Sequence, residues 1–130
     1  MVKIKDIEEC IDYIFNLIKD SISNNKINFS RIEKYDIEKR KQWLLSIVLI
    51  ETYTKDEIDE IVLESNLIDV NDEYKIIVDL SYGNGFILKD SFLIISKKSS
   101  VNKEEMLKYI YENLYNTIAS EISFALNSLT

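Results

Sequence analysis

Isoleucine recurs at every third or fourth position near the beginning of the chain, and charged residues fill many of the positions between. The apolar residues of this stripe are Ile4, Ile7, Ile11, Ile14 and Ile18. Their spacing places them on one face of an α-helix, so the pattern predicts an amphipathic helix that ends at the polar run 23–25. The single cysteine, Cys10, lies beside the stripe, and we interpret it as a core residue and not as a reactive thiol.

The apolar residues that follow are also spaced as in a helix. Between the mid-thirties and Tyr53 they are Ile37, Trp43, Leu44, Ile47, Val48 and Ile50. We therefore predict a second helix there, with its apolar second half at the centre of the core. Thr54 and Glu57 have the spacing of a capping box, which predicts a third helix that ends near Asn66.

After residue 73 the period of the pattern changes to two. Apolar residues at 74, 76, 78, 80 and 82 alternate with largely polar ones, which is typical of a β-strand. The two glycines of the chain, Gly83 and Gly85, flank Asn84 and predict a turn. Apolar runs at 86–88 and 92–95 then predict the return, either as one strand with a bulge or as two strands.

The last part of the chain is again helical in its pattern. Asn102 and Glu105 have capping spacing, and the apolar residues after them fall at steps of four: Met106, Ile110, Leu114, Ile118, Ile122 and Leu126. A helix of this length would reach about 40 Å at about 1.5 Å per residue. We therefore expect it to span the whole domain, to protrude, or to break near 116–120.

Together these elements predict an α+β fold in one domain over residues 1–130. It has three N-terminal helices, a small antiparallel hairpin or meander at about 74–97, and a long C-terminal helix packed on that sheet. The oligomeric state is left open. The residues expected in the core are Trp43, Ile47, Ile50, Ile76, Val78, Ile110, Leu114 and Ile118.

The amino-acid composition excludes several kinds of catalytic and metal-binding site. The chain of 130 residues has no histidine and one cysteine, which excludes His-based catalytic triads, the usual zinc sites and an internal disulfide. The run 69–73 resembles the beginning of a calcium loop, but Tyr74 stands at the required glycine and Leu80 at the terminal glutamate. We therefore expect no catalytic residue, no metal and no cofactor, and we do not expect an enzyme; a pair of facing carboxylates is the one catalytic arrangement left open.

Charge is distributed unevenly. The net charge is −7, which disfavours direct binding of nucleic acid or of an anionic membrane surface. Residues 51–73, here called the acidic segment, hold nine acidic residues and one lysine, and the other 107 residues sum to +1. The longest apolar stretch, 43–50, is too short to span a bilayer and the N-terminus lacks the pattern of a signal peptide, so we expect a cytoplasmic protein.

The acidic segment is the best candidate for a binding surface. Capping preferences explain acids in the first turn of a helix, but not their continuation beyond it. We therefore predict that this segment binds a basic protein partner, a toxin or effector domain, with tyrosines as anchors. The predicted partner-binding residues are Tyr53, Asp56, Glu57, Glu60, Glu64, Asp69, Asp72 and Tyr74.

An immunity protein has this physical character. It would neutralise a basic toxin or nuclease domain by covering its active cleft. An acidic secretion or effector chaperone is an alternative, although three helices ahead of the sheet would fit that class poorly. A structural subunit of a larger assembly is a second alternative, and an enzyme that uses only carboxylates is a third.

Overall fold

One helix, five strands and a second helical segment follow one another along the chain. The computed structural model describes residues 1–22, 27–51 and 53–127. The N-terminal elements are α1 (Ile4–Ser21), β1 (Ile27–Ile37), β2 (Arg40–Ile50) and β3 (Glu57–Val70). They are followed by β4 (Glu73–Tyr82), β5 (Ile87–Ser96), α2 (Lys103–Ile110), the π-helical turn η1 (Tyr111–Tyr115) and α3 (Asn116–Asn127).

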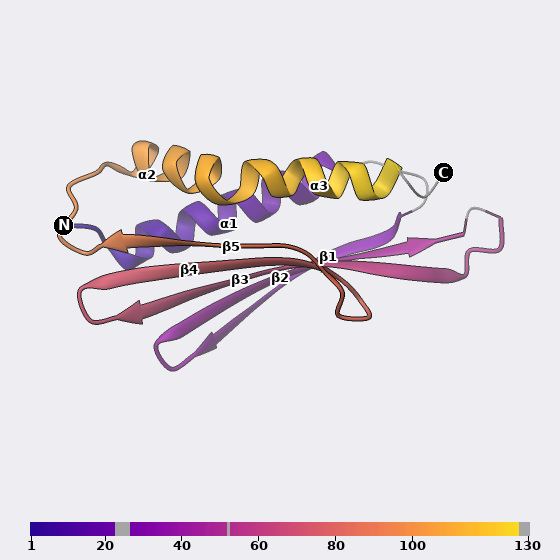
Figure 1. Cartoon of the computed structure of the whole chain (residues 1–130), viewed down its shortest axis with the longest axis horizontal. Coiled ribbons are helices and arrows are strands. Elements are labelled where there is room, and N and C mark those ends of the chain that lie inside the picture. The colour runs from indigo at the N-terminus through magenta and orange to yellow at the C-terminus, as the bar shows by residue number, and fades with distance from the viewer. Residues whose placement is uncertain (23–26, 52, 128–130) are drawn as a thin grey trace.

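The elements form two layers. The strands make one antiparallel meander in the order β1-β2-β3-β4-β5. Helix α1 and the segment α2–η1–α3 lie together over one face of this sheet (Figure 1). No further element among the described residues covers the opposite face, which we call the open face.

The predicted fold class is wrong in its N-terminal half. The stretches predicted as a second and a third helix are strands β1, β2 and β3, so the structure has one N-terminal helix and a sheet of five strands. Burial alternates along β2, where Trp43, Leu45, Ile47 and Leu49 all point into the core. Apolar residues also occupy much of the other face of β2, so helical and strand spacing were both satisfied and the pattern alone did not separate them.

Turn chemistry explains why the hairpins were missed. Residues in the turns after β1, β2 and β3 have the left-handed conformation although none is glycine: Lys39 (φ 59°), Lys55 (φ 64°) and Asn71 (φ 53°). This conformation costs a residue with a Cβ roughly 1–2 kcal/mol, and lysine is not a residue that signals it. The turn at Gly83–Gly85, where glycine does occur, is confirmed.

The C-terminal half agrees with the expectations. Strand β4 is present, and β5 is one strand that includes residues 89–91. The side chain of Asn102 accepts a hydrogen bond from the backbone N–H of Glu105 at 2.8 Å and caps α2. Helical residues then run from 103 to 127 without a gap, and the irregularity is the π-helical turn η1 at 111–115, just before the stretch where we expected a break. The expected turn at 23–25 lies outside the described residues.

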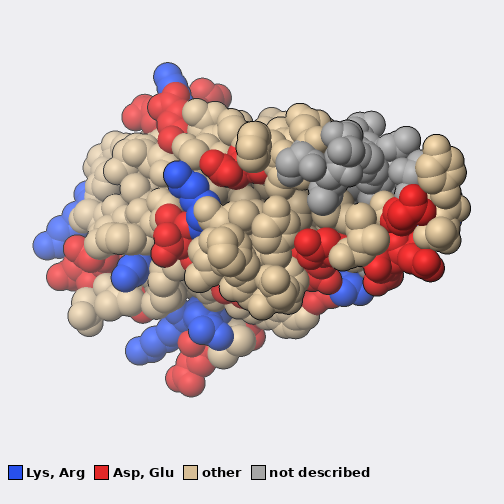
Figure 2. All heavy atoms as spheres, turned by 45° about the vertical axis from the view of Figure 1, so that its right-hand side comes forward, with Lys and Arg blue, Asp and Glu red and all other residues tan. Residues whose placement is uncertain are grey.

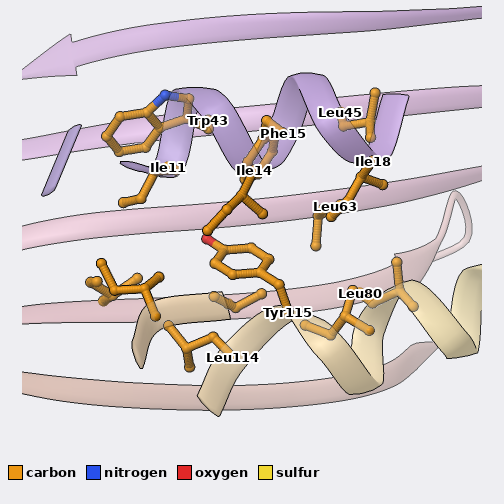
Figure 3. Close-up of a cluster of buried hydrophobic side chains, with 14 of the residues drawn as sticks. Ile11, Ile14, Phe15, Ile18, Trp43, Leu45, Leu63, Leu80, Leu114 and Tyr115 are labelled. Carbon is orange, nitrogen blue, oxygen red and sulfur yellow. The ribbon is translucent and has the colours of Figure 1, made fainter. Parts of the chain in front are cut away.

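The core lies between the helices and the covered face of the sheet. All eight residues expected in the core are buried, three of them on a strand where a helix was predicted. Tyr115 lies in the middle of the buried cluster (Figure 3), where its ring meets the ring of Phe15 edge to face. Its hydroxyl shares a hydrogen bond of 2.6 Å with the hydroxyl of Ser65, and burial raises its pKa. Ser65 and Tyr115 thus satisfy each other inside an apolar core.

Candidate functional site: an acidic tip and an acidic row

The structure divides the acidic segment among three places. Tyr53, Asp56, Glu57 and Glu60 lie at the β2–β3 connection, Glu64 lies in the middle of β3, and Asp69, Asp72 and Tyr74 lie at the β3–β4 end. Strand β3 has 14 residues, which at about 3.3 Å per residue separates its ends by about 45 Å. The predicted residues therefore do not form one contact surface.

The β3–β4 end is engaged within the fold. Lys97 forms an ion pair with Asp69, which raises the lysine pKa, and its ammonium lies 5.1 Å from the ring centre of Tyr74. Tyr74 itself is 8% exposed and belongs to the core. The carbonyl of Asp72 accepts the backbone N–H of Lys97 at 2.9 Å, although its side chain is exposed. These contacts attach the β3–β4 turn to the chain after β5, so we exclude this end from the candidate site.

The β2–β3 end, by contrast, projects from the sheet. We call residues 51 and 53–60 the acidic tip; its acids are Glu51, Asp56, Glu57, Asp59 and Glu60, and its one base is Lys55. Pairing between β3 and β4 begins at Ile61–Tyr82, and β1 pairs with β2 as far as Leu49, which lies opposite Asp59; the pair Ile50–Glu57 and the turn beyond it therefore extend past the neighbouring strands. The connection extends beyond the β4–β5 hairpin at the right of Figure 1, and acidic side chains gather at that end of the molecule in Figure 2.

Hydrogen bonds hold the acidic tip in shape. The Glu51 carboxylate accepts the backbone N–H groups of Thr54 (2.6 Å) and Tyr53 (2.9 Å), which lowers its pKa. The Glu51 backbone N–H donates to the carbonyl of Asp56 at 2.8 Å, and the Lys55 N–H donates to the carbonyl of Glu51 at 3.0 Å. The ordered turn presents Tyr53, which is 91% exposed, together with the half-exposed Ile58. A shaped tip loses less conformational entropy on binding.

The base of the tip is attached to the β4–β5 turn. The backbone N–H of Gly83 donates to the carbonyl of Glu60 at 2.8 Å. A Cβ at position 83 would lie 3.2 Å from the Cβ of Glu60, which is tighter than an ordinary contact. Glycine at this position therefore permits the close approach of the two hairpins.

A second acidic feature lies on the open face of the sheet. The register places Glu64 of β3 opposite Asp79 of β4, and Asp79 opposite Asp90 of β5. We call these three residues the acidic row. Burial and, next, the charge of Asp90 raise the pKa of Asp79. Among the described residues no ion pair involves any of the three, and like charges directly opposite on neighbouring strands are destabilising.

Sequence reasoning found only one member of this row. Asp79 and Asp90 lie outside the acidic segment; Asp79 stands between Val78 and Leu80, and Asp90 stands between Lys89 and Ser91. The alternation along β4 places Asp79 on the face opposite Val78 and Leu80. What brings Asp90 and Glu64 beside it is the strand register, and the third helix predicted over Glu64 concealed that register.

A hollow and an unusual amide adjoin the acidic row. A shallow depression of about 500 Å³ is lined by Lys75, Ile77, Asp79, Asp90, Ser91 and Phe92. Phe92 is 61% exposed, and the ammonium of Lys75 lies 5.0 Å from its ring centre. Asn66 is only 9% exposed; its Nδ2 donates to Glu64 at 3.2 Å, while its Oδ1 is buried with no hydrogen-bond partner among the described residues.

The carboxylates of the acidic tip and of the acidic row are suited to binding lysine and arginine side chains of another protein. The described residues contain no group of three or more His, Cys, Asp or Glu side chains that could hold a metal ion. Cys10 is buried in α1, and burial raises its pKa, which disfavours the reactive thiolate. None of the described helices is both long enough and apolar enough to cross a membrane.

Comparison of the chain with family models, with curated proteins and with solved structures finds no match in any of the three.

Proposed function

We propose that this chain is a protein-binding module whose acidic tip enters a basic cleft on a partner protein. The observation that carries the proposal is the end of the β2–β3 hairpin, which has five acids, one lysine and the exposed Tyr53, and whose turn extends beyond the neighbouring strands. A projecting turn fits a cleft better than a flat surface does. Its carboxylates would meet lysine and arginine side chains, and Tyr53 would supply an apolar anchor at the centre.

The partner class that fits best is a toxin or nuclease domain, which makes the chain an immunity protein of the cytoplasm. A cleft that grips nucleic acid must be basic, because it binds phosphates. Opposite charges also accelerate encounter, which favours an inhibitor that has to capture a toxin quickly. The net charge of −7 and its concentration in the acidic segment support this function.

The observed fold removes an objection to the secretion-chaperone alternative. The objection to it was the presence of three helices ahead of the sheet, and the structure has one. The two functions differ in what is bound. An immunity protein binds a folded toxin domain and abolishes its activity, whereas a chaperone binds an extended segment of its effector and leaves the folded domain active.

The test uses the protein that co-purifies with the chain from its native host, identified and then purified separately. Asp56→Lys with Glu57→Lys reverses two exposed charges whose carboxylates form no hydrogen bond or ion pair within the described part of the chain. Asp20→Lys with Glu112→Lys changes the net charge equally on exposed helix positions and is the matched control. Association rates are measured at low and at physiological salt, together with the activity of the partner.

We expect the tip variant to associate about tenfold more slowly at low salt and to lose inhibition, because it loses charge attraction. The control should keep the wild-type rate. Equal rates for the two variants, or a partner whose activity the wild-type chain leaves unchanged, would contradict the immunity function. Binding restricted to an unfolded segment of the partner would support the chaperone alternative.

A further inference from the structure

On the open face, the sign of the charge stays the same across the strands but changes along them. Across the strands it stays negative from Glu64 through Asp79 to Asp90. Along the strands it does not: on β4 the same face carries Lys75, Ile77 and Asp79 in turn. Complementary charges from a partner would therefore have to be arranged across the strands.

The environment of the row also favours a cationic partner. Three carboxylates lie on adjacent strands, about 4.8 Å apart from one strand to the next, without a described counter-ion. Beside them the nearly buried amide of Asn66 donates to Glu64 and leaves its Oδ1 without a donor. Buried polar groups in folded proteins are normally paired, so an unpaired acceptor next to an uncompensated row is unusual. A cationic group from a partner would compensate the row.

An α-helix has the spacing that the row requires. Residues three or four apart on a helix lie about 5–6 Å from each other, close to the spacing between strands. We infer that the open face is a second docking surface, which binds a basic amphipathic helix of a partner protein lying across strands β3, β4 and β5. Arginine or lysine at three successive turns would meet Glu64, Asp79 and Asp90.

Apolar residues beside the row would meet the other part of such a helix. On the same three strands the register places Ile77 and Phe92, with the amide of Asn66 beside them, in the neighbouring line across the sheet. Phe92 is 61% exposed. A helix with basic residues on one stripe and apolar residues beside it matches these two lines together. Nucleic acid and anionic lipid carry the wrong sign for the row.

This inference does not depend on the acidic tip, and a synthetic probe tests it without knowledge of the natural partner. The probe is an 18-residue helical peptide with arginine at positions i, i+4 and i+7 and leucine on the adjoining stripe. Its control is a peptide of the same composition whose arginines are distributed around the helix. Binding of both peptides is measured by calorimetry to the wild-type chain, to Asp79→Asn with Asp90→Asn, and to the tip variant Asp56→Lys with Glu57→Lys.

The ordered peptide should bind the wild-type chain at least about fivefold more tightly than its scrambled control, because only it places its charges along the row. The Asp79→Asn, Asp90→Asn protein should lose this preference, while its urea midpoint stays equal to or above that of the wild type. The tip variant should keep the preference, which separates the two surfaces. Equal binding of both peptides, or an unchanged preference after the two substitutions in the row, would overturn the inference.

Discussion

The two faces of the sheet differ in whether their polar groups are paired. On the covered face the hydroxyls of Ser65 and Tyr115 are buried together and bond to each other at 2.6 Å. On the open face, one residue from Ser65, Glu64 is set beside two more carboxylates and Asn66 keeps an acceptor unpaired. The covered face is arranged for stability, whereas the open face keeps groups that cost stability. Proteins retain such features mainly at functional sites.

A truncation in the helix layer tests the covered face most strongly. Leu114 lies in η1 and is 3% exposed within the core cluster. Leu114→Ala should lower the free energy of unfolding by about 2–5 kcal/mol, because it removes buried contacts and leaves a cavity. Urea unfolding with an unchanged m-value measures the loss. The same substitution at Leu17, which is 44% exposed on α1, should cost much less. A similar loss at both positions would show that the helices do not define the core as described.

The buried hydroxyl pair gives a smaller and more specific effect. Tyr115→Phe keeps the ring in place but leaves the hydroxyl of Ser65 without its partner in the core. We expect a loss of about 1–3 kcal/mol, the usual cost of a buried polar group without a hydrogen bond.

Ser65→Ala combined with Tyr115→Phe is the control for this pair. It removes both polar groups, so the double variant should recover much of the loss, as a double-mutant cycle in urea would show. Additive losses would mean that the two hydroxyls do not depend on each other. The covered face would then not differ from the open face in the way that we describe.

The sequence predicted the helices at both ends and the last hairpin because each had a local signal. The isoleucine stripe of α1, the alternation of β4, the glycines at 83 and 85 and the Asn102 cap are all readable within a few residues. The turns after β1 and β2 had no such signal, because they use Lys39 and Lys55 in place of glycine, whereas Asn71 after β3 is a residue that tolerates the left-handed conformation. The apolar residues on both faces of β2 then favoured a helix.

The candidate site shows the same difference between features with a local sequence signal and features that depend on contacts distant in the chain. The charge count identified the acids of the acidic tip, since they are neighbours in the chain, and their role in binding stays a prediction. It also included Asp69 and Tyr74, whose engagement with Lys97 depends on contacts across 23 to 28 residues. The acidic row is a product of register, and a register cannot be read from a segment whose strands are mistaken for helices.

The smallest effect, and the one that distinguishes the open face, is a gain in stability at Asp79. Asp79→Asn removes the repulsion from Asp90 and the cost of a partly buried charge, and cross-strand pairs of this kind contribute about 0.2–1 kcal/mol.

The raised pKa of Asp79 determines how this gain depends on pH. The folded chain binds the proton more tightly than the unfolded chain, so the cost of the charge is fully present above the folded pKa. It disappears as the pH falls through that pKa to below about 4, the ordinary value for aspartate. Urea midpoints should therefore be higher for the variant at pH 7 and equal to the wild type near pH 3.5, with Glu112→Gln on the exposed helix surface unchanged at both. The groups that face Asp79 are Glu64, Asp90 and Lys75. A lower midpoint at pH 7 would mean that Asp79 is held by a favourable contact, and the contrast between the two faces would fail.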